Sequence, residues 1–238
     1  MENVVYILLA AFLSGVIGTG LGGLMGVMFP RISPLSLKRM LSATAGLMLA
    51  IVCFELLPES MEGSMLWGSV GLIAGIMGML LLSPLVREDN EKLRTGKLVG
   101  AGIALHNFPE GLAIGAGMAG SGLLGATLAL TIALHDIPEG VAMALPLREG
   151  GTGRKKAVLA AVISGIPTVL GAAVGIFLGG VSQGALAFSL GLAGGAMLEV
   201  TCCQLLPEST EKKTGGSLMA GLLFGAAICF FLHGNLHH

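Results

Sequence analysis

Apolar residues form long runs along the 238-residue chain, and short polar segments separate these runs. A run of about 20 apolar residues is long enough to cross the hydrocarbon layer of a membrane as a helix. We therefore predict eight spans, which cover residues 4–27, 40–57, 66–86, 97–119, 122–146, 156–180, 184–206 and 216–233. Little sequence is left outside them, so residues 1–238 are predicted to form a single transmembrane domain.

Composition and charge agree with a membrane protein. Hydrophobic residues make up 54% of the chain and charged residues 11%, and the mean hydropathy is +0.88. All 13 cations follow odd-numbered spans, namely Arg31, Lys38, Arg39, Arg87, Lys92, Arg94, Lys97, Arg148, Arg154, Lys155, Lys156, Lys212 and Lys213. Because cytoplasmic loops collect Lys and Arg, we predict cytoplasmic loops over 87–97 and 148–156 and both termini outside the cell membrane. We expect a lipid bilayer as partner and no nucleic acid.

One segment of the chain is repeated at long range. Residues 46–60 match residues 195–209 at a constant offset, and both copies end in Leu-Leu-Pro-Glu-Ser. The copies lie in the second and seventh predicted spans, one even-numbered and the other odd-numbered, so they should cross the membrane in opposite directions. This pattern predicts an all-α fold in a 3+2+3 arrangement, with an inverted repeat around a central pair of helices, as in secondary transporters.

The central pair carries a second repeat, and this one is polar. Residues 104–111 read ALHNFPEG and residues 133–140 read ALHDIPEG. In a helix the His and Glu of each copy are four residues apart and share a face. Two such helices facing each other would gather six donors, His106, Asn107, Glu110, His135, Asp136 and Glu139. Pro109 and Pro138 should kink the helices and free carbonyl groups beside these donors.

Three carboxylates in a membrane need a counter-charge. Each costs about 2.5–3.5 kcal/mol at the bilayer centre, and no Lys or Arg falls inside a span core. Protons or metal ions remain, and imidazole with carboxylate suits Zn²⁺, Fe²⁺, Mn²⁺ or Co²⁺, as one ion or two. The alternative is that His and Glu simply pair across packed helices.

The paired HNFPEG and HDIPEG segments, with the eight-span layout, resemble the ZIP family of divalent metal transporters. The resemblance implies Zn²⁺ import toward the cytoplasm, with Fe²⁺, Mn²⁺, Co²⁺ or Cd²⁺ as further ions and no other cofactor. It implies that the six donors form a site for one or two metal ions. It also implies an elevator-like motion of the helices that carry the site.

The sequence departs from this family pattern at two positions. Thr168 stands where many relatives place a glutamate for the second metal, and Gln204 stands where they tend to carry an acidic residue. We therefore expect a weaker second metal position. Glu199 lies near the middle of a span and is a candidate for the transport pathway, whereas Glu55 lies near a helix end and could instead reach the interface.

Two other functions use the same residues. A passive channel would hold the ions in a fixed pore, but the inverted repeat favours a carrier. An intramembrane metal-dependent hydrolase is less compatible, because no H-E-x-x-H motif or separate general base is present, and we predict that the chain is not an enzyme. Glycines such as Gly71, Gly75 and Gly78 allow homodimer contacts as readily as internal packing.

Overall fold

The computed structural model describes residues 2–28, 33–120, 122–177, 182–209 and 213–236. These residues are almost entirely helical, and no strand occurs among them. In chain order the elements are α1 (Glu2–Ala11), η1 (Phe12–Ile17), α2 (Gly18–Met28), α3 (Pro34–Ile51), η2 (Val52–Leu56), α4 (Leu57–Gly63), α5 (Met65–Leu82), η3 (Ser83–Leu85), α6 (Glu91–Gly120), α7 (Gly122–Glu149), α8 (Arg154–Ser164), α9 (Ile166–Phe177), α10 (Gln183–Val200), η4 (Thr201–Leu205), α11 (Leu206–Ser209) and α12 (Gly215–Leu236). The elements η1, η2 and η4 are π-helical, and η3 is a 3-10 turn.

Five helical stretches of the described chain are long and apolar enough to cross a membrane. They are Val4–Met28, Pro34–Gly63, Met65–Leu85, Arg154–Phe177 and Gln183–Ser209. The two longest single helices, α6 and α7, are not among the five, because the polar residues of their motif lower the mean hydropathy. Residues 91–97, expected in a loop, belong to α6.

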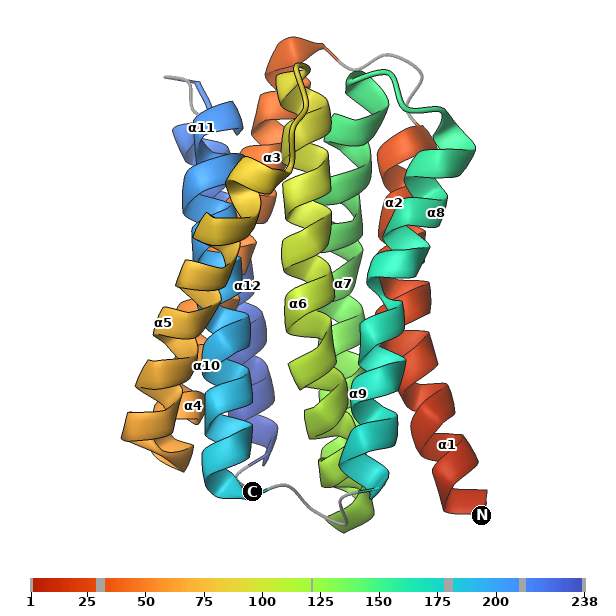
Figure 1. Ribbon diagram of the computed structural model, residues 1–238, viewed down its shortest axis with the longest axis vertical. Coiled ribbons are helices and arrows are strands. Elements are labelled where there is room, and N and C mark those ends of the chain that lie inside the picture. The colour runs from red at the N-terminus through yellow and green to blue at the C-terminus, as the bar shows by residue number, and fades with distance from the viewer. Residues whose placement is uncertain (1, 29–32, 121, 178–181, 210–212, 237–238) are drawn as a thin grey trace.

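The helices divide into two groups that lie side by side (Figure 1). In the first, which we call the motif group (residues 2–28 and 91–177), α6 packs on α9, α2 on α7, and α6 on α7. In the second, the companion group (residues 33–85 and 182–236), α5 packs on α10 and α3 packs on α12. Contact between the groups runs mainly through α6 and α10.

The two ends of the molecule differ in charge. Both termini lie at one end, and the opposite end gathers the last turns of α2, α5, α7 and α11 and the first turns of α3, α6, α8 and α12 (Figure 1). The described Lys and Arg residues belong to these turns and the segments beside them; Arg31 and Lys212 fall outside the described residues. Because α3 starts at the cationic end and α10 starts at the other, the two copies of the long repeat run in opposite directions.

Glycine holds the helices of each group close together. A Cβ placed on Gly111 of α6 would clash with the carbonyl oxygen of Thr168 in α9, and one on Gly140 of α7 would clash with that of Thr19 in α2. In the companion group Gly71 and Gly75 of α5 meet carbonyl groups of α10 in the same way. Such backbone contact is typical of membrane helices that pack on small residues.

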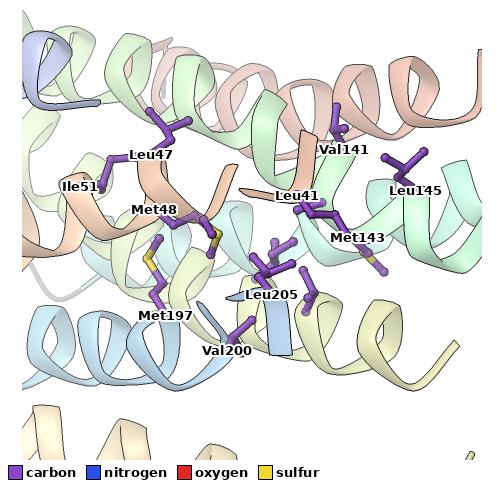
Figure 2. Packing of buried hydrophobic residues seen from close by; sticks show 14 of the residues in the cluster. Leu41, Leu47, Met48, Ile51, Val141, Met143, Leu145, Met197, Val200 and Leu205 are labelled. Carbon is purple, nitrogen blue, oxygen red and sulfur yellow. The ribbon is translucent and has the colours of Figure 1, made fainter. Parts of the chain in front are cut away.

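The two groups meet instead through larger apolar side chains. Figure 2 shows part of the main buried cluster, in which Leu and Met residues of α3 and α10 lie beside residues of α7. The labelled members are Leu41, Leu47, Met48, Ile51, Val141, Met143, Leu145, Met197, Val200 and Leu205. Side chains of this kind repack at modest cost, and methionine adapts most readily.

Two π-helical segments occupy equivalent places in the long repeat. η2 starts at Val52 and η4 starts at Thr201, and the segments have the same length. In each, a backbone N–H reaches five residues back, from Leu57 to Val52 and from Leu206 to Thr201. The next residue is proline in both copies. Proline offers no N–H and crowds the carbonyl four residues earlier, so a wider turn before it relieves this conflict.

Candidate metal centre

Five of the six donors of the repeated motif meet between α6 and α7. His106, Asn107 and Glu110 lie on α6, and their counterparts lie on α7. All six residues are at most 3% exposed. Both helices continue through Pro109 and Pro138 without a break in their helical residues. The centre is therefore a buried polar site between two continuous helices.

Each histidine faces the glutamate of the other motif copy. Nε2 of His106 lies 2.8 Å from Oε2 of Glu139, and Nε2 of His135 lies 3.0 Å from Oε1 of Glu110. The His135–Glu110 pair has the geometry of a hydrogen bond. The His106–Glu139 pair is close enough for a hydrogen bond but is not aligned for one. This reciprocal pairing joins the two copies into one centre.

The orientation of the His106 ring leaves Nε2 open to a ligand. Its Nδ1 lies 3.1 Å from the carbonyl oxygen of Gly102, one turn earlier in α6. Because a carbonyl can only accept, Nδ1 is the protonated nitrogen of the neutral ring, and Nε2 then carries a lone pair. In that form the lone pair faces the Glu139 carboxylate, which is also an acceptor, so a cation between them, either a proton or a metal ion, would join the pair. Metal-binding histidines are oriented in this way.

Asp136 lies at the middle of the centre. Its carboxylate belongs to two groups of three ligand residues, one with His106 and Glu139 and the other with Glu110 and His135. Within each group the ligand atoms lie within 4.8 Å of one another. Neither oxygen of Asp136 has a hydrogen-bond partner among the described residues. A buried carboxylate without partners is costly, so Asp136 is suited to bind a cation.

Asn107 occupies the position equivalent to Asp136 but contacts a different element. Its Nδ2 donates to the carbonyl oxygen of Ser164 at 2.8 Å, at the end of α8. The chain turns at Gly165 before α9 begins, which leaves this carbonyl available. Oδ1 of Asn107 has no partner in the described residues and remains a possible ligand.

The expected pathway residues lie outside both groups of three. Thr168 of α9 is fully buried, packs against Gly15, and has no partner for Oγ1 in the described chain. Glu55 of η2 is half-buried and accepts from Sγ of Cys229 at 3.6 Å. Glu199 of α10 is buried and interacts with the side chains of Cys203 and Gln204.

Two contacts at the centre were not expected from the sequence. The carbonyl groups of Gly102 and Ser164 orient His106 and Asn107. Every residue has a backbone carbonyl, so the residue type does not reveal which carbonyl will accept a hydrogen bond. The Ser164-Gly165 pair does mark a helix interruption. In addition, Gly18 of α2 lies against Asp136, where its own Cβ would be 2.9 Å from that of the aspartate. A larger residue there would press on the carboxylate.

Comparison with known proteins identifies the family to which the chain belongs. The family described as ZIP Zinc transporter matches residues 90–233. The chain is 36% identical over 249 residues to "Zinc transporter ZIPB" of Bordetella bronchiseptica, an alignment that covers 92% of this chain and 78% of that protein. It is 29% identical over 251 residues to "Zinc transporter ZupT" of Stenotrophomonas maltophilia, covering 94% and 93% of the two chains.

The family match includes both copies of the polar motif. The apolar helices agree with a multi-pass membrane protein, and the buried cluster is compatible with a divalent cation as substrate. The chain belongs to the ZIP zinc transporter family, a family of divalent metal transporters and not of enzymes.

Proposed function

We propose that this protein carries Zn²⁺ across the cell membrane toward the cytoplasm through the centre between α6 and α7. The observation that carries the proposal is Asp136, a fully buried carboxylate shared by two His/Glu pairs. Three carboxylates and two imidazoles match the ligands that zinc takes in proteins. Fe²⁺, Mn²⁺, Co²⁺ and Cd²⁺ are expected as competitors, because affinity for such donors differs among metals in degree rather than kind.

We also propose eight membrane spans in the 3+2+3 order, with both termini outside. The opposite directions of α3 and α10, and the matching π-helical segments η2 and η4, support an inverted repeat around α6 and α7. The cationic end of the molecule would face the cytoplasm. Dimer formation stays a prediction, although Gly78 of α5 has open space around it, unlike Gly71 and Gly75.

The mechanism proposed is alternating access with an elevator-like motion of the motif group. Backbone contacts at glycine join the helices within each group, whereas Leu and Met side chains fill the boundary between groups. A rigid unit can shift along such a boundary with little loss of packing. On this proposal Thr168 lies beside a weaker second metal position, and Glu55, Glu199 and Gln204 line the route of the ion.

The test is uptake of Zn²⁺ by proteoliposomes that contain the purified protein. We expect uptake that saturates with zinc concentration in the wild type and is lost in the His106→Ala/Glu139→Ala variant. Asp89→Ala/Glu91→Ala, which removes two exposed carboxylates at the cationic end, serves as the control and should keep uptake. Uptake that rises without saturation would identify a channel. Equal uptake by both variants would reject the site.

A further inference from the structure

A groove of about 490 Å³ lies between α2 and α8, at the cationic end of the molecule. Leu24 and Met28 form one wall and Leu159 forms the other, and these side chains are 47%, 63% and 55% exposed. Val27, which is buried, lies at the bottom. The groove is therefore apolar along its length and open to the outside of the helix bundle.

The packing of α2 on α8 explains where the groove lies. Closer to the middle of the bundle the two helices touch, because a Cβ on Gly23 would lie 2.6 Å from that of Ala161. Gly20 meets Val162 in a similar way, at 3.1 Å. Beyond these glycines α2 carries Leu24 and Met28. Their larger side chains hold the helices apart and leave the groove between them.

Cationic side chains lie at one end of the groove. Arg154 and Lys155 line it, and Lys156 follows on the same helical turn. No ion pair joins these three to a carboxylate in the described chain, whereas Lys92 pairs with Glu149 and Lys97 with Glu88 nearby. The cations at the groove are therefore available to an external anion.

The start of α8 adds to this preference for negative charge. Its N-cap residue is Gly153, which offers no side-chain cap, and the first turn contains no acidic residue. The first N–H groups of a helix have no acceptor within the helix. Together with the helix dipole they favour an anion at this end.

We propose that this groove binds one anionic phospholipid, with an acyl chain along the apolar walls and the phosphodiester at Arg154 and Lys155. Charge complementarity selects this occupant over a zwitterionic lipid, because the latter brings a cation of its own to the headgroup. The depth of the apolar walls selects it over a free phosphate, which gains nothing from them. The inference does not depend on which metal the protein carries.

The experiment is native mass spectrometry of the full chain in detergent, titrated with phosphatidylglycerol or phosphatidylcholine that carry the same acyl chains. A cation near a lipid headgroup contributes about fivefold in affinity, so two should give about a 30-fold preference for phosphatidylglycerol. We expect the wild type to retain one phosphatidylglycerol with that preference, and Arg154→Gln/Lys155→Gln to lose it.

Two matched variants separate the groove from charge in general. Arg39→Gln/Arg87→Gln removes two exposed cations from the same end of the molecule but not from the groove, and should keep the preference. Leu24→Ala/Leu159→Ala keeps all charges, and should weaken binding of both lipids severalfold by shortening the apolar walls. Equal binding of the two lipids by the wild type, or equal losses in the two charge variants, would overturn the proposal.

Discussion

Asn107 and Asp136 occupy the same place in two copies of one motif, yet they make different contacts. The amide of Asn107 donates to the Ser164 carbonyl, and this bond ties α6 to the end of α8. The carboxylate of Asp136 cannot donate when ionised, and both its oxygens stay free beside the two His/Glu pairs. A difference of one functional group thus separates an anchoring residue from a residue suited to bind the ion.

Two single substitutions, each giving one residue the side chain of the other, test that difference. In Asp136→Asn the shape is kept but one charge is lost, and we expect Zn²⁺ affinity to fall about 100-fold, the upper range for residues that support a metal site. Competition with a fluorescent zinc chelator in detergent would measure it. Asn107→Asp keeps the donor oxygen and should cost less affinity. A larger loss in Asn107→Asp than in Asp136→Asn would contradict the roles assigned here.

The sequence predicted that the two motif copies face each other but not how their residues pair. The i, i+4 spacing places His106 and Glu110 on one face of α6, and this holds for any helix. Which glutamate a histidine faces depends on how far α6 and α7 are shifted along each other. That shift depends on how α6 and α7 pack on each other and on α9 and α2, and local spacing does not encode this packing.

At the scale of helices, glycine determines how closely neighbours approach. The carbonyl oxygen of Thr168 occupies the place where Gly111 would carry a Cβ. The reverse contact also occurs, because Gly171 of α9 meets the carbonyl group of Phe108 in the same manner. Since Phe108 and Gly111 lie within two residues of Glu110, a predicted metal ligand, this packing also fixes the position of the candidate metal centre.

A single methyl group should disturb this packing. We expect Gly111→Ala to push α9 from α6 and to destabilise the protein by about 1–3 kcal/mol, the usual cost of overpacking. The lower Tm would be seen in thermal denaturation in detergent. Gly78→Ala is the matched control, since Gly78 also lies within a helix but has nothing within 4 Å of its Cβ position. Equal Tm values for the two variants would contradict close contact between α6 and α9.

The apolar runs predicted where helices lie better than where they begin. α6 begins at Glu91, six residues before the predicted span, because Oδ1 of Asn90 accepts from the N–H groups of Lys92 and Leu93 and caps the helix. The π-helical segments were also missed. Their proline signal is present in the sequence, but a continuous apolar run looks the same whether its turns are α-helical or π-helical, so hydropathy does not distinguish them.

For the whole molecule, the central question is whether the motif group moves against the companion group. Gly102 of α6 and Val200 of α10 face each other across the boundary, and a Cβ on Gly102 would lie 3.4 Å from that of Val200. This is close to the distance of about 3.5–4.5 Å that a disulfide requires. With the native cysteines replaced, we expect Gly102→Cys/Val200→Cys to take up zinc when reduced and to stop when oxidised.

A cross-link inside one group provides the control. A Cβ on Gly26 of α2 would lie 3.3 Å from that of Ala144 in α7, and both helices belong to the motif group. Oxidation of Gly26→Cys/Ala144→Cys should leave uptake unchanged. Continued uptake by the oxidised Gly102→Cys/Val200→Cys variant would argue for a fixed pore.

The orientation of the molecule is a second prediction at this scale. Met65 is 72% exposed at the start of α5, at the end that carries both termini, whereas Asp89 is exposed at the cationic end. With the native cysteines replaced, an impermeant maleimide should label Met65→Cys in intact cells. It should reach Asp89→Cys only after permeabilisation. The reverse pattern would place the termini in the cytoplasm.

The two helix groups also have a consequence for biosynthesis. The motif group is complete once the ribosome has made Phe177, because α2, α6, α7, α8 and α9 all precede that point. The companion group must wait, since α5 needs α10 and α3 needs α12, the last helix of the chain. Gly46 of α3 and the glycines of α5 therefore lack the helices they pack against throughout most of translation, and the candidate metal centre can assemble before the companion group is complete.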